Sequence, residues 1–485
     1  MIAQLLKAYQ DGSKVDLKDE NAIAQYVMSL LSVGVGYLPY VGPALSAFTN
    51  LLSSVLFPSS GQSTDALWKK LNDRIGALVD QKIADYDAET LRAKLDGVSR
   101  QLNTYSDAVK NYEKASAQEK KQAAEHLRDV QTAALISIEG AVPEFQKDSF
   151  AVASLPMFAA AANAHLMLLS DGVKQGAKWG YDSGTIAGMR ADLKRMTTPG
   201  APSEGGKERT SEKKKALDEA IGKASELNVP KEVVADWKSA AEKLAKGKEE
   251  AGSTDKENYV DWANKTYEEG RKKVKPSQGI INDSGGKEAN ELKAYADYDN
   301  AMRFNVLDYA KLWPYLADKM PDSAKAGLDR ESFYGPYGRG TDGAPWSASA
   351  QAPTEKRGAP ITAVRIWGYD SVDAVQVKYG DTWGEKMGDD GGELKEIALD
   401  KDEYITKVKA QYGQKIGSLE FTTNKGRTLA NGNGKYADGH DYPAQSLDLA
   451  PAAQALSSIR ITQSSETQPP GTEGIVLGFR SLLTG

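Results

Sequence analysis

The sequence contains no cysteine and only three histidines, His126, His165 and His440. The absence of cysteine excludes disulfide bridges, thiolate metal sites, iron–sulfur clusters and cysteine nucleophiles. The chain also lacks HExxH, GxSxG and the phosphate-loop motif GxxxxGK followed by Ser or Thr. A hydrolase built from carboxylates alone leaves no local motif and is the one enzyme class that stays open. We expect no enzyme, no catalytic residue, no metal site and no cofactor.

An excess of positive charge is also missing. The 485 residues include 61 Lys and Arg against 67 Asp and Glu, which gives a formal net charge of −6. Binding to nucleic acid through phosphate contacts requires a strongly basic surface, so we expect no nucleic-acid partner. The composition, with 40% hydrophobic and 26% charged residues, is typical of a soluble globular protein. The length corresponds to roughly three domains.

The N-terminus lacks the pattern of an export signal. Such a signal has a basic region that runs directly into an apolar region, whereas the first 20 residues here are mixed and polar. We therefore expect a chain that is produced without a signal peptide.

A long run without charge follows, because no charged side chain occurs between Glu20 and Asp65. One interpretation is a transmembrane span, for which about 20 apolar residues suffice. The other is a pair of short buried helices joined by a Gly/Pro turn. Pro39 and Pro43 would break a single helix near its middle, which favours the second interpretation.

Two long amphipathic helices are predicted next. Apolar residues recur at steps of three and four over 91–112 and over 116–142, the spacing of helices packed in a bundle. The second helix has a charged side as well as an apolar one. Its charged side includes Glu125, Arg128, Asp129 and Glu139.

The segment 150–169 reads FAVASLPMFAAAANAHLMLL and has no charged side chain other than whatever charge His165 carries. A helix of this length spans about 30 Å, the thickness of a bilayer core. Because it is apolar on all sides, such a helix belongs in the centre of a bundle or in lipid. The residues that we single out in it are Phe150, Leu155, Pro156, Phe158, Asn163, His165, Leu166, Leu168 and Leu169.

Two polar residues interrupt this apolar helix. A polar side chain at such a position is usually hydrogen-bonded within the core, and we favour this for Asn163 and His165. The alternative is functional, with protonation of His165 loosening the bundle.

The composition changes over 197–257, which is rich in Lys, Glu, Gly and Ser. Two weakly amphipathic patterns interrupted near Pro230 indicate an exposed pair of helices, or else a mobile linker. Proteases cut exposed and poorly packed chain, so we expect activating cleavage at basic residues in such segments. The candidates are Lys14, Lys18, Lys207 and Arg209.

From residue 331 onwards the pattern is that of an antiparallel β-domain. Runs such as ITAVRIWG and YITKVKAQYG alternate β-branched or aromatic residues with polar ones, and Gly, Pro and Ser separate them. We therefore divide the chain into a helical domain, 1–330, and a β-domain, 331–485. Loops of the β-domain supply the candidate contacts to a receptor or glycan, namely Asp381, Trp383, Asp389, Asp390, Asn431, Asn433, Tyr436, His440 and Tyr442.

These residues carry a family resemblance. The segment 77–109, ALVDQKIADYDAETLRAKLDGVSRQLNTYSDAV, resembles the second and third helices of the pore-forming domain of insecticidal delta-endotoxins, the Cry family. The segment 155–180, LPMFAAAANAHLMLLSDGVKQGAKWG, is similar to the central fifth helix of that domain. The last 130 residues or so, in particular 364–380, resemble the β-prism of jacalin-related lectins, and the second domain of delta-endotoxins is itself a β-prism.

The resemblance implies an α + β multidomain fold. We expect a seven-helix bundle around a central apolar helix, with the charged insertion 197–257, followed by an antiparallel β-prism and no third β-sandwich domain. It also implies an insecticidal pore-forming toxin whose β-prism binds a receptor or glycan on the target cell. The hairpin 116–169 would then insert into the membrane and oligomerise into a lytic channel. Glu125, Arg128, Asp129 and Glu139 would line this channel.

Two other interpretations stay open. The chain is a jacalin-like lectin with a helical oligomerisation stalk, or it is one subunit of a binary toxin that acts with a second subunit. The apolar helix argues against a stalk, which has no need of one. In the leading interpretation a bacterium releases the protein or stores it in inclusions, and the protein acts outside that cell, at the host cell membrane.

Overall fold

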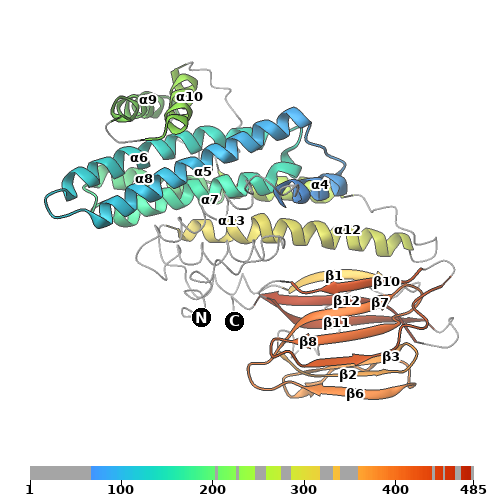
Figure 1. Cartoon of the computed structure of the whole chain (residues 1–485). Coiled ribbons are helices and arrows are strands. Elements are labelled where there is room, and N and C mark those ends of the chain that lie inside the picture. Colours follow the sequence, from blue (N-terminus) through green and yellow to red (C-terminus); the bar gives the residue numbers. More distant parts are fainter. Residues whose placement is uncertain are drawn as a thin grey trace. The chain divides into compact units, whose positions relative to one another are not determined.

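A computed structural model describes residues 67–201, 206–225, 229–245, 258–274, 286–316, 331–338, 359–439, 443–451, 454–464 and 471–481 (Figure 1). The uncharged run after Glu20 lies outside these ranges, as do the predicted cleavage positions Lys14 and Lys18. His440 and Tyr442 of the predicted binding loops lie outside them too.

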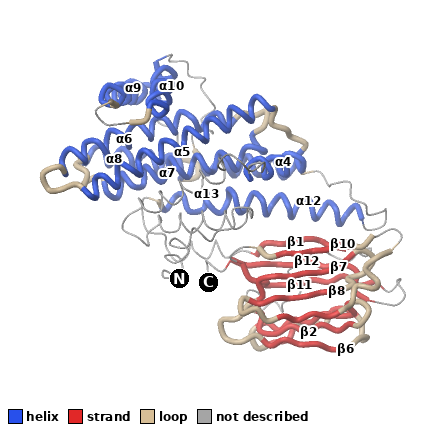
Figure 2. Tube along the Cα trace, viewed as in Figure 1, coloured by secondary structure: helices blue, strands red, loops and turns tan. Residues whose placement is uncertain are grey.

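The chain forms two compact units, one mainly of helices and one mainly of strands (Figure 2). Residues 1–273 and 301–324 make up the helical unit, and residues 274–300 and 325–485 make up the β unit. This division differs from the expected boundary at 330/331 in assigning most of one late helix to the β unit.

The helices are given in chain order. In the helical unit they are α4 (Leu67–Val79), α5 (Asp85–Lys114), α6 (Lys120–Ala141), the 3-10 helix η3 (Val142–Gln146), α7 (Ala151–Gln175), α8 (Ser183–Thr197), α9 (Gly206–Lys223), α10 (Lys231–Ala245), α11 (Tyr259–Lys273), α13 (Asp308–Leu312) and the 3-10 helix η6 (Trp313–Tyr315). The late helix α12 (Gly286–Met302) leads through the π-helix η5 (Arg303–Leu307) into α13.

Helices α5, α6 and α7 run side by side (Figure 1). The predicted apolar side of α5 is buried, because Leu91, Leu95, Val98 and Leu102 are at most 2% exposed. Helix α6 begins a few residues later than predicted. The Ser116 hydroxyl and the Glu119 carboxylate each accept a hydrogen bond from the other residue's backbone N–H, which is a reciprocal capping arrangement.

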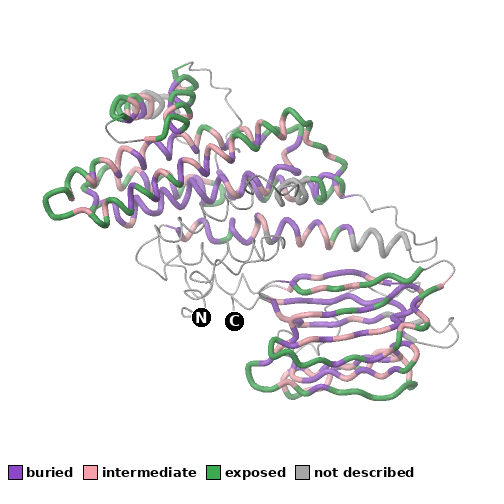
Figure 3. Tube along the Cα trace, in the orientation of Figure 1, coloured by how far each residue is buried: buried purple, intermediate pink, exposed green. Residues whose placement is uncertain are grey.

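Helix α7 is enclosed along most of its length (Figure 3). All of its residues are buried except Ala151, Pro156, Ala160 and Lys174. Helices α4, α5, α6, α8, α11 and α13 all contact it. The helix continues six residues past the apolar run 150–169 and ends at Gln175.

The charged segment after α8 forms a pair of helices over its described residues, so the mobile-linker interpretation is wrong for 206–223 and 231–245. The pair α9–α10 lies against α6 (Figure 1). Lys207 and Arg209 lie within α9 and not in irregular chain as expected. A protease requires the chain around its cut to unfold locally, so the helix lowers the susceptibility of both positions.

The β unit contains three antiparallel sheets. Their orders are β1-β12-β11, β10-β7-β8-β9 and β4-β3-β2-β6, with β5 paired to β3. The strands are β1 (Glu331–Gly338), β2 (Ile361–Gly368), β3 (Val372–Tyr379), β4 (Thr382–Trp383), β5 (Met387–Gly388), β6 (Glu393–Ala398), β7 (Ile405–Tyr412), β8 (Ser418–Thr423), β9 (Thr428–Asn431), β10 (Gln445–Leu449), β11 (Gln454–Ser464) and β12 (Gly471–Ser481).

One apolar core joins these three sheets. Each sheet contributes alternate residues that are fully buried, for example Val364, Phe421 and Leu477. Alternation of this kind places one side of each sheet inward and one outward. The shortest strands, β4 and β5, have two residues each and were not predicted, because alternation needs a longer run to be visible.

The packing of α7 predicts a large loss of stability on truncation. Leu166 is fully buried in α7, so we expect Leu166→Ala to lower the free energy of unfolding of the helical unit by about 2–5 kcal/mol. Tyr86 in α5 is 79% exposed, and we expect Tyr86→Ala to stay within about 0.5 kcal/mol of the parent. Denaturant unfolding followed by helical circular dichroism measures both. Equal effects of the two substitutions would contradict the burial of α7.

Candidate membrane-inserting helix and binding loops

An aromatic cluster holds the N-terminal half of α7. The ring of Phe158 lies 5.4 Å from that of Tyr259, 4.3 Å from that of Trp262 and 6.4 Å from that of Trp313, measured between centroids. Two of these contacts are edge-on, the geometry that aromatic pairs prefer. The partners come from α11 and η6, so both elements are tied to α7 through one side chain.

Both polar residues in the middle of α7 are hydrogen-bonded in the core. The Asn163 side-chain oxygen accepts a hydrogen bond of 2.6 Å from the indole N–H of Trp313. The Nδ1 atom of His165 lies 2.9 Å from the Tyr259 hydroxyl. Both side chains are at most 2% exposed. Placing a proton on His165 would create a charge in this buried environment, which costs free energy.

Further polar contacts fix the C-terminal half of α7. The Tyr105 hydroxyl of α5 donates a hydrogen bond of 2.8 Å to the Asp171 carboxylate, which is fully buried. The Gln131 amide of α6 donates one of 2.9 Å to the backbone carbonyl of Leu168. The Asp171 contact ties α7 to α5, whereas the Gln131 contact ties α7 to α6.

Within the described ranges, α7 is the one helix that is long and apolar enough to cross a membrane. Its 25 residues correspond to about 37 Å. The core helix of a soluble protein has the same composition, so the composition alone does not distinguish the two environments.

The four predicted pore-lining residues of α6 differ in their surroundings. Glu125 is exposed. The guanidinium group of Arg128 instead donates a hydrogen bond to the Trp179 backbone carbonyl and lies 5.9 Å from the ring of Tyr181. Arg128 therefore fastens α6 to the chain that follows α7.

The other two residues contact α9. The Asp129 carboxylate lies 3.0 Å from the ammonium group of Lys223, and the Glu139 carboxylate lies 2.7 Å from that of Lys213. The hydrogen bond and the charge of Asp129 raise the pKa of Lys223 above its ordinary value. The sequence suggested a charged side that is free in water. In this structure, α9 covers part of it.

Some residues of the predicted binding loops are buried and hold neighbouring strands together, whereas others are exposed. Asn431 is 5% exposed, and its amide donates hydrogen bonds to the backbone carbonyls of Ile366 and Glu393, at 3.0 and 2.8 Å. It joins the end of β9 to β2 and β6, so it is not available to a receptor. Asn433, two residues later, is exposed.

Three turns of the β unit lie around Asp370 and Asp373. One of them, 432–438, contains Asn433. Its amide donates a hydrogen bond of 3.0 Å to the Asp370 carboxylate, and Lys435 forms an ion pair of 2.7 Å with the same carboxylate. The ammonium group of Lys435 also lies 5.1 Å from the ring of Tyr436. The hydrogen bond from Lys435 lowers the pKa of Asp370. Sequence reasoning missed Asp370, whose only local sign is the turn GYDS between two predicted strands.

The third turn contains Asp389 and Asp390. The backbone N–H of Asp389 donates a hydrogen bond of 2.9 Å to the carbonyl of Asp373, which ties this turn to β3. Burial and the charge of Asp389 raise the pKa of Asp373. Asp390 is exposed and pairs with Lys386 at 2.8 Å. The turns at 369–371, 389–392 and 432–438 thus form one loop cluster, which we call the Asp370 cluster.

The remaining two loop candidates lie together near β4. The ring of Trp383 has the Arg365 guanidinium group 3.9 Å from its centroid. Asp381 is exposed beside it. Since Trp383 is stacked on Arg365, part of its ring is already in contact within the protein.

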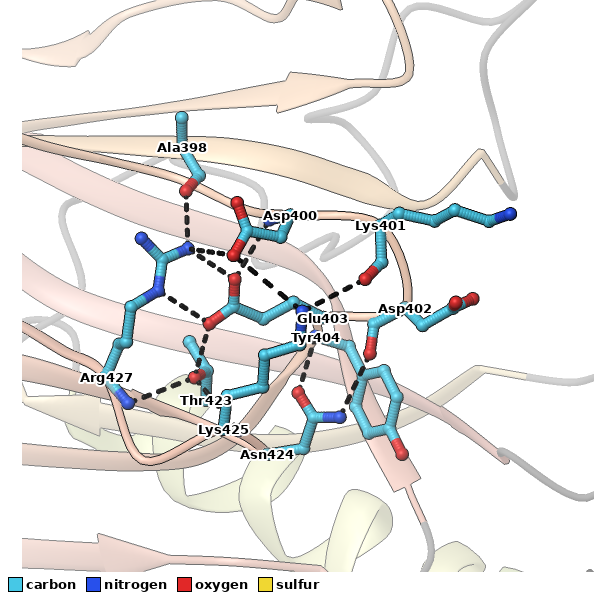
Figure 4. Close-up of polar contacts among 10 residues, drawn as sticks. All are labelled: Ala398, Asp400, Lys401, Asp402, Glu403, Tyr404, Thr423, Asn424, Lys425 and Arg427. Atoms are coloured by element: carbon cyan, nitrogen blue, oxygen red, sulfur yellow. Dashed lines mark hydrogen bonds and ion pairs between the residues drawn. The ribbon is translucent and has the colours of Figure 1, made fainter.

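An ion pair between a buried carboxylate and a partly exposed guanidinium group braces other loops of the β unit (Figure 4). The Glu403 side chain has no exposed surface and accepts hydrogen bonds from the Arg427 guanidinium group and, at 2.7 Å, from the Thr423 hydroxyl. Arg427 also donates to the backbone carbonyl of Ala398 at 2.7 Å. These hydrogen bonds from Arg427 lower the pKa of Glu403 to about 2, against the effect of desolvation, which would raise it. The pair joins the β6–β7 turn to the β8–β9 hairpin.

No group of three His, Asp or Glu side chains in the described part of the chain is placed to hold a metal ion.

Two family models match the chain. The delta endotoxin N-terminal domain matches residues 30–198, and the jacalin-like lectin domain matches residues 334–447. The resemblance to both families is thus confirmed, and the chain carries one domain of each.

Curated relatives match the N-terminal part. The pesticidal crystal protein Cry8Ba of Bacillus thuringiensis serovar kumamotoensis is 29% identical over 191 residues, which is 38% of this chain and 16% of that protein. The pesticidal crystal protein Cry9Ea of Bacillus thuringiensis subsp. aizawai is 31% identical over 160 residues, 31% of this chain and 13% of that protein. The match spans less than a fifth of the length of either relative.

Solved structures extend the likeness of fold to nearly the whole chain. The insecticidal delta-endotoxin Cry8Ea1 of Bacillus thuringiensis has a TM-score of 0.58 at 17% identity, covering 98% of this chain and 74% of that one. The mosquito-larvicidal Cry4Aa toxin of Bacillus thuringiensis has a TM-score of 0.60 at 15% identity, covering 95% and 74%. PirB has a TM-score of 0.52 at 14% identity, covering 95% and 94%. The helical unit and the antiparallel sheets therefore have the Cry toxin fold.

The Glu403–Arg427 pair predicts a defined acid sensitivity of the β unit. The folded state lowers the pKa of Glu403 from 4.5 to about 2. The stability that the pair contributes is therefore present above pH 4.5 and is lost as the pH falls toward about 2. We expect Glu403→Gln to lower stability at neutral pH and to abolish this part of the pH dependence.

Hydrogen exchange of peptides covering 398–427, measured across this pH range, tests the expectation. The control is Glu385→Gln, because Glu385 is exposed. If the curves of Glu403→Gln and the parent stay parallel down to the most acid pH, the pair does not supply the pH dependence.

Proposed function

We propose that this chain, which joins a delta endotoxin N-terminal domain to a jacalin-like lectin domain, is an insecticidal pore-forming toxin. Its action is membrane permeabilisation and involves no enzymatic step. The observation that carries the proposal is α7, an apolar helix that the other helices enclose and that is long enough to cross a bilayer.

The physical argument is that two environments suit the same helix. In water, burial of apolar surface contributes roughly 25 cal/mol per Å2, which keeps α7 inside the bundle. A bilayer provides an equally apolar environment, and a helix satisfies its own backbone groups there. The difference between the two states is therefore small enough for a receptor or a membrane surface to shift it.

Helix α6 is the natural partner of α7 in the membrane. Its 22 residues correspond to about 33 Å, and the short η3 connects the two helices. One side of α6 is apolar, whereas Glu125, Arg128, Asp129 and Glu139 make the other side charged. In an oligomer the charged side faces a water-filled lumen and the apolar side faces lipid or a neighbouring copy.

The polar residues of α7 favour an oligomer over a single inserted hairpin. Asn163, His165 and Asp171 lose Trp313, Tyr259 and Tyr105 as partners when the hairpin leaves the bundle. Polar groups inside a membrane face other protein segments or a water-filled cavity. Contacts between copies provide both, so we expect these residues to face the interior of the assembled channel.

The jacalin-like domain directs the toxin to its target. Lipid partition selects no cell type, and a lectin domain recognises a glycan or a glycosylated receptor. The Asp370 cluster, with Asn433 and Tyr436, is the accessible group of polar and aromatic side chains that fits this task. The protein thus acts outside the bacterium that makes it, at the host cell membrane.

A reversible lock on the hairpin tests pore formation. Lys147, in the turn between η3 and α7, lies 3.6 Å from the Asp87 carboxylate of α5. Because the chain has no cysteine, Asp87→Cys with Lys147→Cys introduces two thiols that a short cleavable bismaleimide can join. We expect the cross-link to lower dye leakage from insect midgut membrane vesicles at least about tenfold, and reduction of the linker to restore it.

The matched control places the same cross-link within one helix. Asp107 and Lys110 pair at 3.0 Å in α5, so linking cysteines at these positions leaves the hairpin free, and leakage should persist. The proposed function is contradicted if the parent protein releases no dye, or if the locked protein leaks as fast as the control.

A second experiment addresses targeting. We expect Asn433→Ala with Tyr436→Ala to weaken binding to midgut membrane vesicles about tenfold or more, since aromatic anchors dominate recognition surfaces. Lys401→Ala, an exposed change in a different turn, serves as the control. Equal binding of both variants, measured by vesicle sedimentation, would exclude the Asp370 cluster as the receptor site.

A further inference from the structure

The helix pair α9–α10 lies beyond the part of the chain that matches the delta endotoxin domain, which ends at residue 198. Both helices contact α6, and α10 also contacts α5 (Figure 1). The pair therefore covers part of the outer side of the hairpin that we propose to insert.

In the ion pairs described here between α9–α10 and the hairpin, the lysines belong to α9–α10 and the carboxylates belong to the hairpin. Lys213 and Lys223 of α9 reach Glu139 and Asp129 of α6, as described above. Lys243 of α10 reaches Glu144 at 3.2 Å. Glu144 lies in η3, which connects α6 to α7. Three lysines of the pair thus meet three carboxylates of the hairpin.

Helix α10 is anchored separately on α5. The Asp236 carboxylate forms an ion pair of 3.0 Å with Arg100. The buried indole N–H of Trp237 donates a hydrogen bond of 2.7 Å to the side-chain oxygen of Gln101. The pair therefore links α5, which stays in the bundle, to the hairpin, which leaves it.

The apolar contribution to this attachment is small. Among the side chains that the structure describes in α9 and α10, the large buried apolar ones are Leu217, Val233 and Trp237, and the other buried apolar ones are alanines. The lysines and carboxylates that link it to the hairpin are a quarter to a half exposed, and ion pairs with this exposure are individually weak. Detaching the pair therefore costs less than extracting α7.

We propose that α9–α10 is a clasp that holds the α6–α7 hairpin in the bundle and must detach before the hairpin enters the membrane. The clasp covers Asp129 and Glu139, which would line the lumen, and its own lysine-rich surface has no place in lipid. The three ion pairs both hold the hairpin and neutralise these carboxylates until release. This inference rests on the proposed function, because a clasp has an effect only if the hairpin leaves the bundle.

Tethering the clasp tests the inference without altering a pore-lining candidate. Glu144→Cys with Lys243→Cys, joined by the same cleavable reagent, ties α10 to η3. We expect dye leakage to fall at least about tenfold and to return on reduction. The matched control is Lys214→Cys with Asp218→Cys, an ion pair of 2.5 Å within α9, whose cross-link should leave leakage unchanged.

Weakening the clasp should have the opposite effect. Lys213→Gln with Lys223→Gln removes two of the three ion pairs and largely preserves the helix propensity at both positions. We expect the initial rate of leakage to rise about 3- to 10-fold, in line with two partly exposed ion pairs. Lys214→Gln, which lacks a partner on the hairpin, should leak at the parent rate. Circular dichroism establishes that the variants are folded.

The outcomes separate the two proposals. If the parent releases no dye, the proposed function fails. Suppose that the parent protein releases dye, that the Asp87–Lys147 cross-link stops the release and that the Glu144–Lys243 cross-link does not. The proposed function then stands, and the clasp is overturned. A Lys213/Lys223 double variant that is folded and leaks at the parent rate also overturns the clasp.

Discussion

A helix that is apolar on every side has to be enclosed, and this constraint organises the helical unit. Six neighbouring helices contact α7, and 21 of its residues are buried. The amphipathic patterns of α5 and α6 are the complement of this helix, because each supplies one apolar side to it and one polar side to water. The aromatic residues of α11 and η6 complete the enclosure around Phe158. The bundle is thus built around a segment that has no stable position in water by itself.

Polar contacts decide how firmly this segment is held. The free energy gained by removing the apolar side chains from water is nearly the same whether α7 lies in protein or in lipid, since both exclude water. The hydrogen bonds of Asn163, His165 and Asp171 exist only in the enclosed state. Their partners Trp313, Tyr259 and Tyr105 belong to helices outside the α6–α7 hairpin. A buried polar group without a partner is costly. These three contacts therefore favour the enclosed state specifically, and in the channel that we propose, contacts between copies would have to replace them.

Much of this fold could be predicted from local patterns, and the failures have a common cause. Periodicity predicted helices over 91–112 and 116–142, close to the observed α5 and α6, because each has a continuous apolar side. The apolar run 150–169 does not show that Asp171 is buried, since a charged residue normally marks a surface and here meets Tyr105 in the core. Asn431 was taken for a surface residue because nothing nearby in the sequence reveals that β2 and β6 supply its acceptors. In each case the deciding partner lies at least 38 residues away.

The ion pairs on the charged side of α6 could not be predicted from nearby sequence either. Its carboxylates looked free because their lysine partners lie 74 and 94 residues further along the chain. A solvated charged side has no protein partner to lose before insertion, whereas a side that is already paired must first lose its partners. Lysines at these positions stabilise the enclosed state without adding to the apolar core, and so they leave the affinity of α7 for lipid unchanged. A clasp of this kind can therefore set the barrier to release independently of the stability of the inserted channel.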